Sequence, residues 1–296
     1  MPSVQQIWKF DNIIPNKLVG QAYARTDAVF NKALNKDFGK MSLQRLTALR
    51  ALMASQAPPL AAYIIPTADA HNSEYIAPVD ARRTWISGFT GSAGTALVTS
   101  SAAFIWTDGR YYTQCEKETD TTLWTLMKQS LPETPTIEKW LSSNLSDEAV
   151  VGVDPHTFTR EEWTPLQTAL TKLNMRLIPV AKNLVDEVRN QLGDPAPARP
   201  NNTVIPLPVK YTGKPAGEKI EELRQKMIEK KASALVITAL DEVAYTLNLR
   251  GSDIEFNPVF FSYLVITPSN ITLFCNGGLP ENVLQQLCDE KVKNFQ

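Results

Sequence analysis

The sequence has few of the residues that metal centres and disulfide frameworks use. Its 296 residues include two histidines, His71 and His156, and three cysteines, Cys115, Cys275 and Cys288. The cysteines are odd in number, widely spaced and without a CxxC motif, so we expect no disulfide framework and a reducing compartment. Two histidines supply few donors for a metal site. This scarcity restricts the possible chemistry more than any other count.

Charge imbalance and long apolar runs are also missing. Lys and Arg number 30 against 31 Asp and Glu, a net charge of −1. This balance gives no electrostatic case for binding nucleic acid or an anionic membrane surface. No apolar stretch reaches the roughly 18 residues of a membrane span, and the first residues show no signal-peptide pattern. We therefore expect a cytoplasmic protein with neither nucleic acid nor membrane as a partner.

Helical and strand patterns alternate along the chain. Leucines recur at helical spacing after Ser42, which we take as the N-cap of a first helix. An apolar strand run follows at residues 61–65, and a hairpin is expected on either side of Ser100 and Ser101. Further strands are expected at 123–127, 150–153 and 177–180, and further helices at 136–145 and 159–173. This alternation predicts an α/β fold.

The order of helix, strand, polar-aromatic segment and hairpin occurs twice. Six prolines between residues 193 and 217 separate the two copies and indicate an extended linker. We predict four parts: an N-terminal extension (1–40), a first domain (41–190), a proline-rich linker (191–217) and a second, related domain (218–296). The second copy is much shorter than the first, so we expect it to be incomplete.

Five motifs occur in one order across the two copies. They are DAHNSEYIAP (69–78), SGFTGSAGTA (87–96), WTDGRY (106–111), LNLRGSD (247–253) and NPVFFSY (257–263). The ordered set resembles the cytosolic Xaa-Pro aminopeptidases (aminopeptidase P) of the creatinase/prolidase superfamily. The resemblance implies two creatinase N-terminal-like domains, each a mixed sheet flanked by helices, and a C-terminal "pita-bread" domain that holds two metal ions, usually manganese.

The resemblance also implies an activity. Family members are metallo-exopeptidases that remove an N-terminal residue preceding proline, so the partner would be a peptide with proline at its second position. That bond is a tertiary amide without an N–H, and two metals can polarise its carbonyl and supply hydroxide. In the family the metal ligands lie in the C-terminal domain, beyond the point where this sequence ends. We therefore expect no catalytic residue, metal ligand or cofactor in this chain, and no activity from it alone.

Arg110 is the one residue that we predict to bind substrate. It lies in a Thr-Asp-Gly-Arg turn, and in the family the arginine of this motif reaches toward the substrate. A guanidinium offers several donors in a planar fork, suited to a peptide carbonyl or carboxylate. The alternative is a turn arginine paired with Asp108. We expect Asp108 and Gly109 to build the turn, with Gly109 at positive φ.

Two other motifs favour structural over chemical roles. His71 and Glu74 are three residues apart, which could place both on one helical face, but one pair falls far short of a metal site, so we expect structural hydrogen bonds. The GxxGxxG run at residues 88–94 differs from a dinucleotide fingerprint and precedes a strand, whereas a phosphate loop opens a helix. We expect these glycines to allow tight packing around Phe89.

Arg250, Asp253 and Asn257 form a polar loop before Pro258. They either hold this loop by hydrogen bonds or contact the absent catalytic domain or a second subunit, and a homodimer is one option. Two other functions stay open: a non-catalytic creatinase-like module that binds peptides or histones, and a regulatory short isoform. The near-neutral charge does not favour the histone reading.

Overall fold

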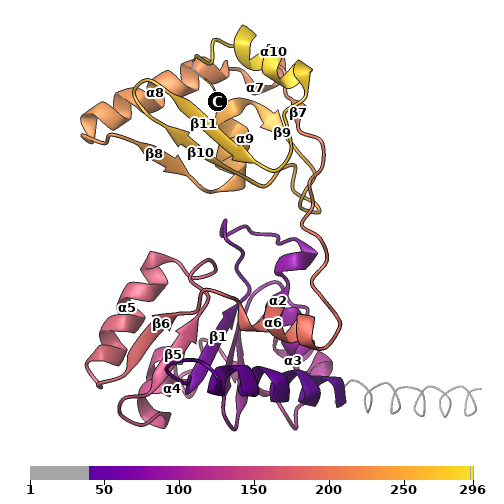
Figure 1. Ribbon diagram of the computed structural model, residues 1–296, viewed down its shortest axis with the longest axis vertical. Helices are drawn as coiled ribbons and strands as arrows, with labels where there is room; N and C mark the ends of the chain where they lie inside the picture. The colour runs from indigo at the N-terminus through magenta and orange to yellow at the C-terminus, as the bar shows by residue number, and fades with distance from the viewer. Residues whose placement is uncertain (1–39, 294, 296) are drawn as a thin grey trace, which may run out of the picture.

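The computed structural model describes residues 40–293 and residue 295. Two α/β units, joined by an extended segment, make up this part of the chain (Figure 1). The predicted extension at residues 1–40 lies outside the described residues except for residue 40. None of the helices in the described range is long and apolar enough to cross a membrane.

The first unit contains a six-stranded mixed sheet in the order β4-β3-β2-β1-β5-β6. β1 runs antiparallel to β2 and parallel to β5, and β3 runs parallel to β4. The strands are β1 (Ala62–Pro66), β2 (Thr95–Thr99), β3 (Ala103–Thr107), β4 (Thr125–Lys128), β5 (Val150–Val153) and β6 (Arg176–Pro179). All strands of this sheet except β2 run in the same direction, so the carboxyl ends of β1, β3, β4, β5 and β6 share one edge.

Successive side chains of a strand point to opposite faces of the sheet. Because successive residues here are apolar, both faces are buried. Tyr63 and Ile65 pack on one face, Ala62 and Ile64 on the other. The first face is covered by the helix of residues 40–54, α2 (Arg82–Ser87), α3 (Tyr112–Glu118) and α6 (Leu184–Gln191). The second is covered by α4 (Ile137–Asn144) and α5 (Arg160–Thr171). The predicted α/β class is thus confirmed.

The second unit contains a three-stranded antiparallel sheet in the order β11-β10-β8. Its strands are β8 (Leu235–Ile237), β10 (Ser262–Ile266) and β11 (Ile271–Cys275). One face packs against α8 (Ala216–Glu229), α9 (Leu240–Leu247) and α10 (Glu281–Asp289). Strand residues that alternate with this core, including Val236 and Phe274, are exposed. The sheet thus buries one face where the first sheet buries two.

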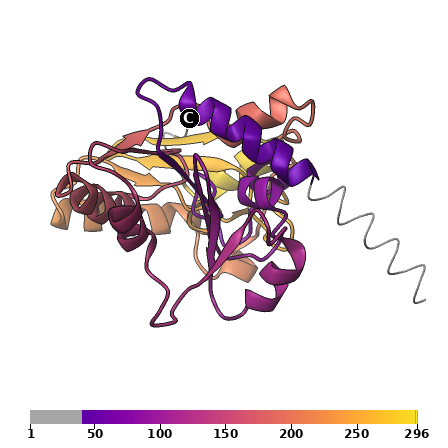
Figure 2. The same ribbon diagram turned by 90° about the horizontal axis from the view of Figure 1, so that it is seen from below.

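The proline-rich segment is attached to the second unit well before α8. β7 (Ile205–Pro206) pairs antiparallel with β9 (Leu249–Arg250), and the short helix α7 (Val209–Thr212) follows. The units are stacked along the long axis, so they overlap when seen from below (Figure 2). The loop after β1, with a turn of 3₁₀ helix at Pro78–Asp80, extends from the first unit toward the second (Figure 1).

Two local predictions are wrong. Ser42 is not an N-cap: it lies inside the first helix, is buried, and its Oγ accepts a hydrogen bond from Trp124 Nε1 at 3.1 Å. Gly109 does not have a positive φ. Gly88, with φ 82°, is the left-handed residue in this region and ends α2. Tertiary packing, which local propensity does not contain, decides the position of Ser42.

Candidate functional site

Polar side chains gather at the carboxyl edge of the first sheet. Asp69 and His71 follow β1, Arg110 follows β3, and Asp154 and His156 follow β5. The three strands run in the same direction, so the loops that follow them emerge at the same edge. In α/β sheets, this edge is where ligands commonly bind. The second unit lies beyond it (Figure 1).

Arg110 folds back onto Asp108 at the end of β3. Its Nε and Nη2 donate to the two carboxylate oxygens at 2.9 and 2.8 Å, and its backbone N–H donates to Oδ1 at 3.0 Å. These hydrogen bonds hold the pKa of Asp108 below its usual value. The Arg110 side chain is 69% exposed, and no hydrogen bond from its Nη1 is found within the described residues. The turn pairing is therefore present, and the substrate role stays a prediction.

The glycine-rich loop packs against Tyr111, the residue that follows this turn. A Cβ on Gly91 would lie 2.6 Å from Phe89 Cε2 and 2.9 Å from Tyr111 Cδ1, so only glycine fits. Phe89 is fully buried, and the Arg83 guanidinium lies 4.5 Å over its ring and donates to the carbonyls of Phe89 and Gly91. Burial lowers the pKa of Arg83 to about 10. The predicted tight packing around Phe89 is confirmed.

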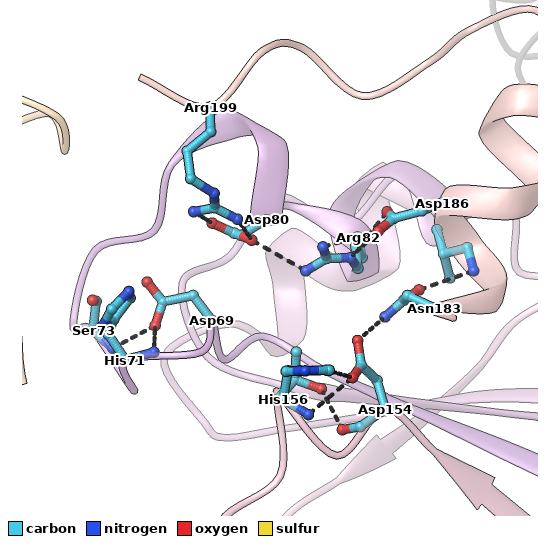
Figure 3. Close-up of polar contacts among 12 residues, drawn as sticks. Asp69, His71, Ser73, Asp80, Arg82, Asp154, His156, Asn183, Asp186 and Arg199 are labelled. Atoms are coloured by element: carbon cyan, nitrogen blue, oxygen red, sulfur yellow. Dashed lines mark hydrogen bonds and ion pairs between the residues drawn. The ribbon is translucent and has the colours of Figure 1, made fainter. Parts of the chain in front are cut away.

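His71 joins the two units. Its Nδ1 lies 2.8 Å from the carbonyl oxygen of Thr238 in the second unit, and its ring lies 4.6 Å from that of Tyr263. Asp69 fixes the loop because its Oδ1 accepts the backbone N–H groups of His71 and Ser73 at 2.9 Å each (Figure 3). The predicted structural hydrogen bonding of His71 is confirmed. Glu74 is exposed and does not join it.

Arg199, in the proline-rich segment, makes a second contact between distant parts of the chain. Its Nη1 and Nη2 donate to the two oxygens of Asp80 at 2.8 Å each, and its guanidinium lies 4.5 Å over the ring of Phe261 in the second unit. Asp80 is only 2% exposed and also binds Arg82 at 3.2 Å, which in turn pairs with Asp186 (Figure 3). An ion pair with Asp80 and packing on the Phe261 ring therefore both hold Arg199 at this contact.

Sequence reasoning missed Arg199 because it treated the segment only as a linker. Arg199 is the single charged residue between Pro195 and Pro208, and that isolation is the signal that could have singled it out. A small apolar cluster beside the Arg199 contact joins the same parts of the chain: Ala77, Val79, Leu240, Ile254, Val259 and Phe261. The two units therefore share a packed interface.

The second histidine has a local structural role. His156 donates its backbone N–H to Asp154 Oδ1 at 2.9 Å, and its Nδ1 lies 3.0 Å from the same oxygen (Figure 3). The other oxygen of Asp154 accepts from Asn183 at 2.8 Å, and Asn183 caps α6. The polar loop before Pro258 has a similar role in part. Asp253 accepts backbone N–H groups of Phe261 and Asn202 at 2.9 and 2.7 Å.

Residues that fit a metal centre do not come together in the described part of the chain. Residues 40–293 and 295 contain no group of three or more His, Cys, Asp or Glu placed to hold a metal ion. The donors present therefore do not fit the pair of metals that the resemblance implies. What the carboxyl edge does offer is the exposed guanidinium of Arg110, held by Asp108. His71 and Arg199 connect this unit to the second one.

Comparison with protein families agrees with this two-unit architecture. Two family models, both described as the creatinase/prolidase N-terminal domain, match residues 45–191 and 195–295. The chain belongs to the creatinase/prolidase N-terminal domain family. Each unit corresponds to one creatinase/prolidase N-terminal match.

Relatives of this creatinase/prolidase chain are much longer than it is. It is 44% identical over 262 residues to "Xaa-Pro aminopeptidase ApepP" of Drosophila melanogaster, covering 87% of this chain and 42% of that protein. It is 47% identical over 233 residues to "Probable Xaa-Pro aminopeptidase P" of Talaromyces marneffei, covering 79% and 35%. The chain thus matches less than half the length of each relative.

A solved structure with the same two-unit arrangement is that of the X-prolyl aminopeptidase of Caenorhabditis elegans. It superposes with a TM-score of 0.80 at 36% identity, covering 86% of this chain and 42% of that one. It is described as a cytosolic enzyme with a di-nuclear active site. The superposition extends over both units, so it includes their relative placement.

Proposed function

We propose that this chain is the N-terminal, substrate-access part of an Xaa-Pro aminopeptidase. The observation that carries the proposal is the superposition on the nematode enzyme across both units. The fruit-fly and fungal relatives carry the same activity in their names. The substrate would be a peptide with proline at its second position. In this proposal the 296 residues position and restrict the peptide and cleave nothing by themselves.

In this proposal, Arg110 is the substrate-binding residue. Its guanidinium is held by Asp108 on a turn that Gly91 and Phe89 support, yet most of the side chain is exposed. A guanidinium held in this way can donate to a peptide carbonyl or carboxylate without ordering a flexible side chain first. The role is binding and orientation. Proton transfer and bond cleavage belong to residues outside this chain.

The catalytic metals would lie in the part of the polypeptide that the relatives have and this chain does not match. Two manganese ions are the expected pair, on the resemblance to the family, and no described cluster in this chain could hold them. A cytoplasmic location is part of the proposal, and the cysteine pattern and the cytosolic description of the nematode enzyme support it. The domain boundaries at residues 41–190 and 218–296, the incomplete second domain and the option of a homodimer remain part of the proposal.

The test is a hydrolysis assay on the 296-residue chain with added manganese and a short Xaa-Pro peptide. We expect no release of the first residue above background. A positive control is the intact fruit-fly relative under the same conditions. Manganese-dependent cleavage by the purified chain at a rate comparable to that control would contradict the proposal.

A further inference from the structure

The ion pair with Asp108 does not by itself explain how Arg110 is held. The two side chains are 32% and 69% exposed. Exposed ion pairs contribute little, because water screens the charges and long side chains lose conformational freedom when they pair. The two residues also lie in the same turn, so their hydrogen bonds do not connect that turn to the rest of the unit. A guanidinium that is presented in one orientation needs a further contact.

Tyr111 supplies a further contact to the guanidinium. The central carbon of the Arg110 guanidinium lies 5.1 Å from the centroid of the Tyr111 ring. A cation within about 6 Å of an aromatic centroid is attracted by the electrons of the ring. The ring and the Asp108 carboxylate therefore restrain the guanidinium together, while its Nη1 makes no hydrogen bond within the described residues.

The glycine-rich loop fixes the position of the Tyr111 ring. The phenol oxygen of Tyr111 lies 2.5 Å from Ser92 Oγ, a hydrogen-bond distance. The Phe89 ring meets the Tyr111 ring edge to face, with 6.1 Å between their centroids. A Cβ on Gly91 would lie 2.9 Å from Tyr111 Cδ1, so the absence of a side chain there makes room for the ring. Three residues of one loop thus define where the ring lies.

The loop is in turn tied to α3, the helix that begins directly after Tyr111. Thr90 donates its backbone N–H and its hydroxyl to the carboxylate of Glu118, at 2.7 and 2.8 Å. The Gln114 side-chain amide donates to Thr90 Oγ1 and to Glu118 Oε1, at 2.9 and 3.0 Å. The loop therefore contacts α3 at one end and the Tyr111 ring at the other, which links the glycine-rich motif to the WTDGRY motif.

We propose that Tyr111 is a positioning residue that presents the Arg110 guanidinium to the peptide, an inference that rests on the proposed function. Tyr111 acts through Arg110 and touches no reacting atom. A ring that only filled space over Phe89 would stabilise the fold and have the same effect whether or not Arg110 were present. A positioning residue instead loses its effect on the substrate when Arg110 is removed.

The first test measures the mobility of Arg110 in the 296-residue chain and needs no peptidase activity. NMR relaxation gives the order parameter of the Arg110 Nε–H bond. Tyr111→Leu removes the ring and should lower the order parameter toward the values below about 0.6 that flexible groups show. Tyr111→Phe should lower it less, because the ring stays and only the hydrogen bond to Ser92 is lost. An unchanged order parameter in Tyr111→Leu would overturn the proposal.

Tyr112 provides the matched control on the same helix. Its hydroxyl donates to the carbonyl of Gln129, and its ring centroid lies 5.6 Å from Lys128 Nζ. Tyr112→Leu therefore removes an equally large ring that carries a different cation. The order parameter of Arg110 should stay unchanged in this variant. A loss as large as that in Tyr111→Leu would show that any damage to α3 loosens Arg110, and the proposal would fail.

The second test is a double-mutant cycle on substrate turnover. The protein is a chimaera in which this chain replaces the matching segment of the fruit-fly relative. Tyr111→Leu should lower kcat/KM on a short Xaa-Pro peptide about 2- to 5-fold, the range for a cation–π contact at an exposed site. In the chimaera that carries Arg110→Ala, the same change should cause no further loss. A loss of equal size in both backgrounds would show that Tyr111 does not act through Arg110.

A conservative pair of variants keeps the proposal testable if Tyr111→Leu does not fold. Ser92→Ala and Tyr111→Phe remove the same hydrogen bond from its two sides. Each should lower the order parameter of Arg110 by the same amount, and the double variant by no more than either alone. Independent, additive losses, or no loss in any of the three, would contradict the proposal.

Failure of the positioning role and failure of the proposed function give different results. An active chimaera in which the order of Arg110 is independent of Tyr111 refutes the positioning role alone. An inactive chimaera in which the order of Arg110 still depends on Tyr111 refutes the proposed function, since the contact is then present without the activity.

Discussion

Two aspartate–arginine pairs at the same end of the first unit differ in burial. Asp80, bound by Arg199, is 2% exposed, and the pair brings the proline-rich segment against both units. Asp108, bound by Arg110, has a side chain that is 32% exposed, and its partner is 69% exposed. Both ion pairs are bidentate, but solvent strongly screens the attraction between the charges only in the Asp108–Arg110 pair. The buried Asp80–Arg199 pair therefore holds the two units and the proline-rich segment together. The exposed Asp108–Arg110 pair leaves the Arg110 guanidinium accessible to a ligand.

The largest expected effect comes from removing the buried carboxylate. Asp80→Ala leaves Arg82 and Arg199 without their shared partner, and breaking a buried pair from one side costs about 3–5 kcal/mol. Urea unfolding should show this loss in the free energy of unfolding. The matched change Asp108→Ala should cost less than about 1 kcal/mol, because exposed pairs contribute little. Equal losses for the two variants would remove the distinction between the pairs.

Gly91→Ala tests whether the Arg110 turn is held rigidly. The added methyl meets the rings of Phe89 and Tyr111, and overpacking of this kind costs about 1–3 kcal/mol. Thermal unfolding should report the loss. Gly278→Ala is the control, because a Cβ there meets nothing within 4 Å. If the two variants are equally stable, the turn is less constrained than the contacts indicate.

The sequence predicted most of the first unit because its signals are local. The buried run at residues 150–153 is β5 as expected, and the hairpin predicted around Ser100 and Ser101 is β2–β3. The hairpin of the second copy is also present, as β10–β11. Thr159, at the start of the helix predicted over 159–173, forms a capping box with Glu162. In contrast, α9 was not predicted: it is one short helix with an exposed Tyr245, within a segment treated as polar-aromatic. Local patterns identify long or fully buried elements best.

The candidate site was only partly predictable for a physical reason. Arg110 and Asp108 are neighbours, so their pairing could be anticipated from the turn. Asp80 and Arg199 are 119 residues apart, and His71 meets Thr238 across 167 residues. No local pattern records such pairs, because they depend on how the two units stack. The position of the units had to come from the structure.

His71→Ala tests the contact between the units with a smaller expected effect. Losing one hydrogen bond to a backbone carbonyl costs about 1 kcal/mol, with some ring packing in addition. Limited proteolysis within residues 192–204 should become faster, because the contact that His71 makes between the units is lost. His156→Ala is the control, since its side chain is 70% exposed and its partner lies in the same unit. Equal proteolysis rates would contradict the role of His71.

The smallest effect on stability is expected at the exposed pair. Arg110→Ala should leave the free energy of unfolding unchanged within the error of the measurement, as for most surface sites. It should also raise the pKa of Asp108 toward its usual 3.8, because the hydrogen bonds from Arg110 depress it. A carboxylate whose pKa is lowered in the folded state stabilises the fold at pH values above its usual, unfolded-state pKa. This stabilisation is lost as the pH falls through the lower pKa of the folded state. Carboxyl NMR titration of both proteins measures the shift.

Arg110 is also where the central claim can be tested most directly. The measurement is kcat/KM on a short Xaa-Pro peptide. It compares a chimaera, in which this chain replaces the matching segment of the fruit-fly relative, with the same chimaera carrying Arg110→Ala. Loss of a hydrogen bond from a charged donor should reduce kcat/KM about 10- to 100-fold, at unchanged melting temperature. Equal kcat/KM values for the two proteins would contradict the account, because the first unit would then contribute no residue to substrate binding.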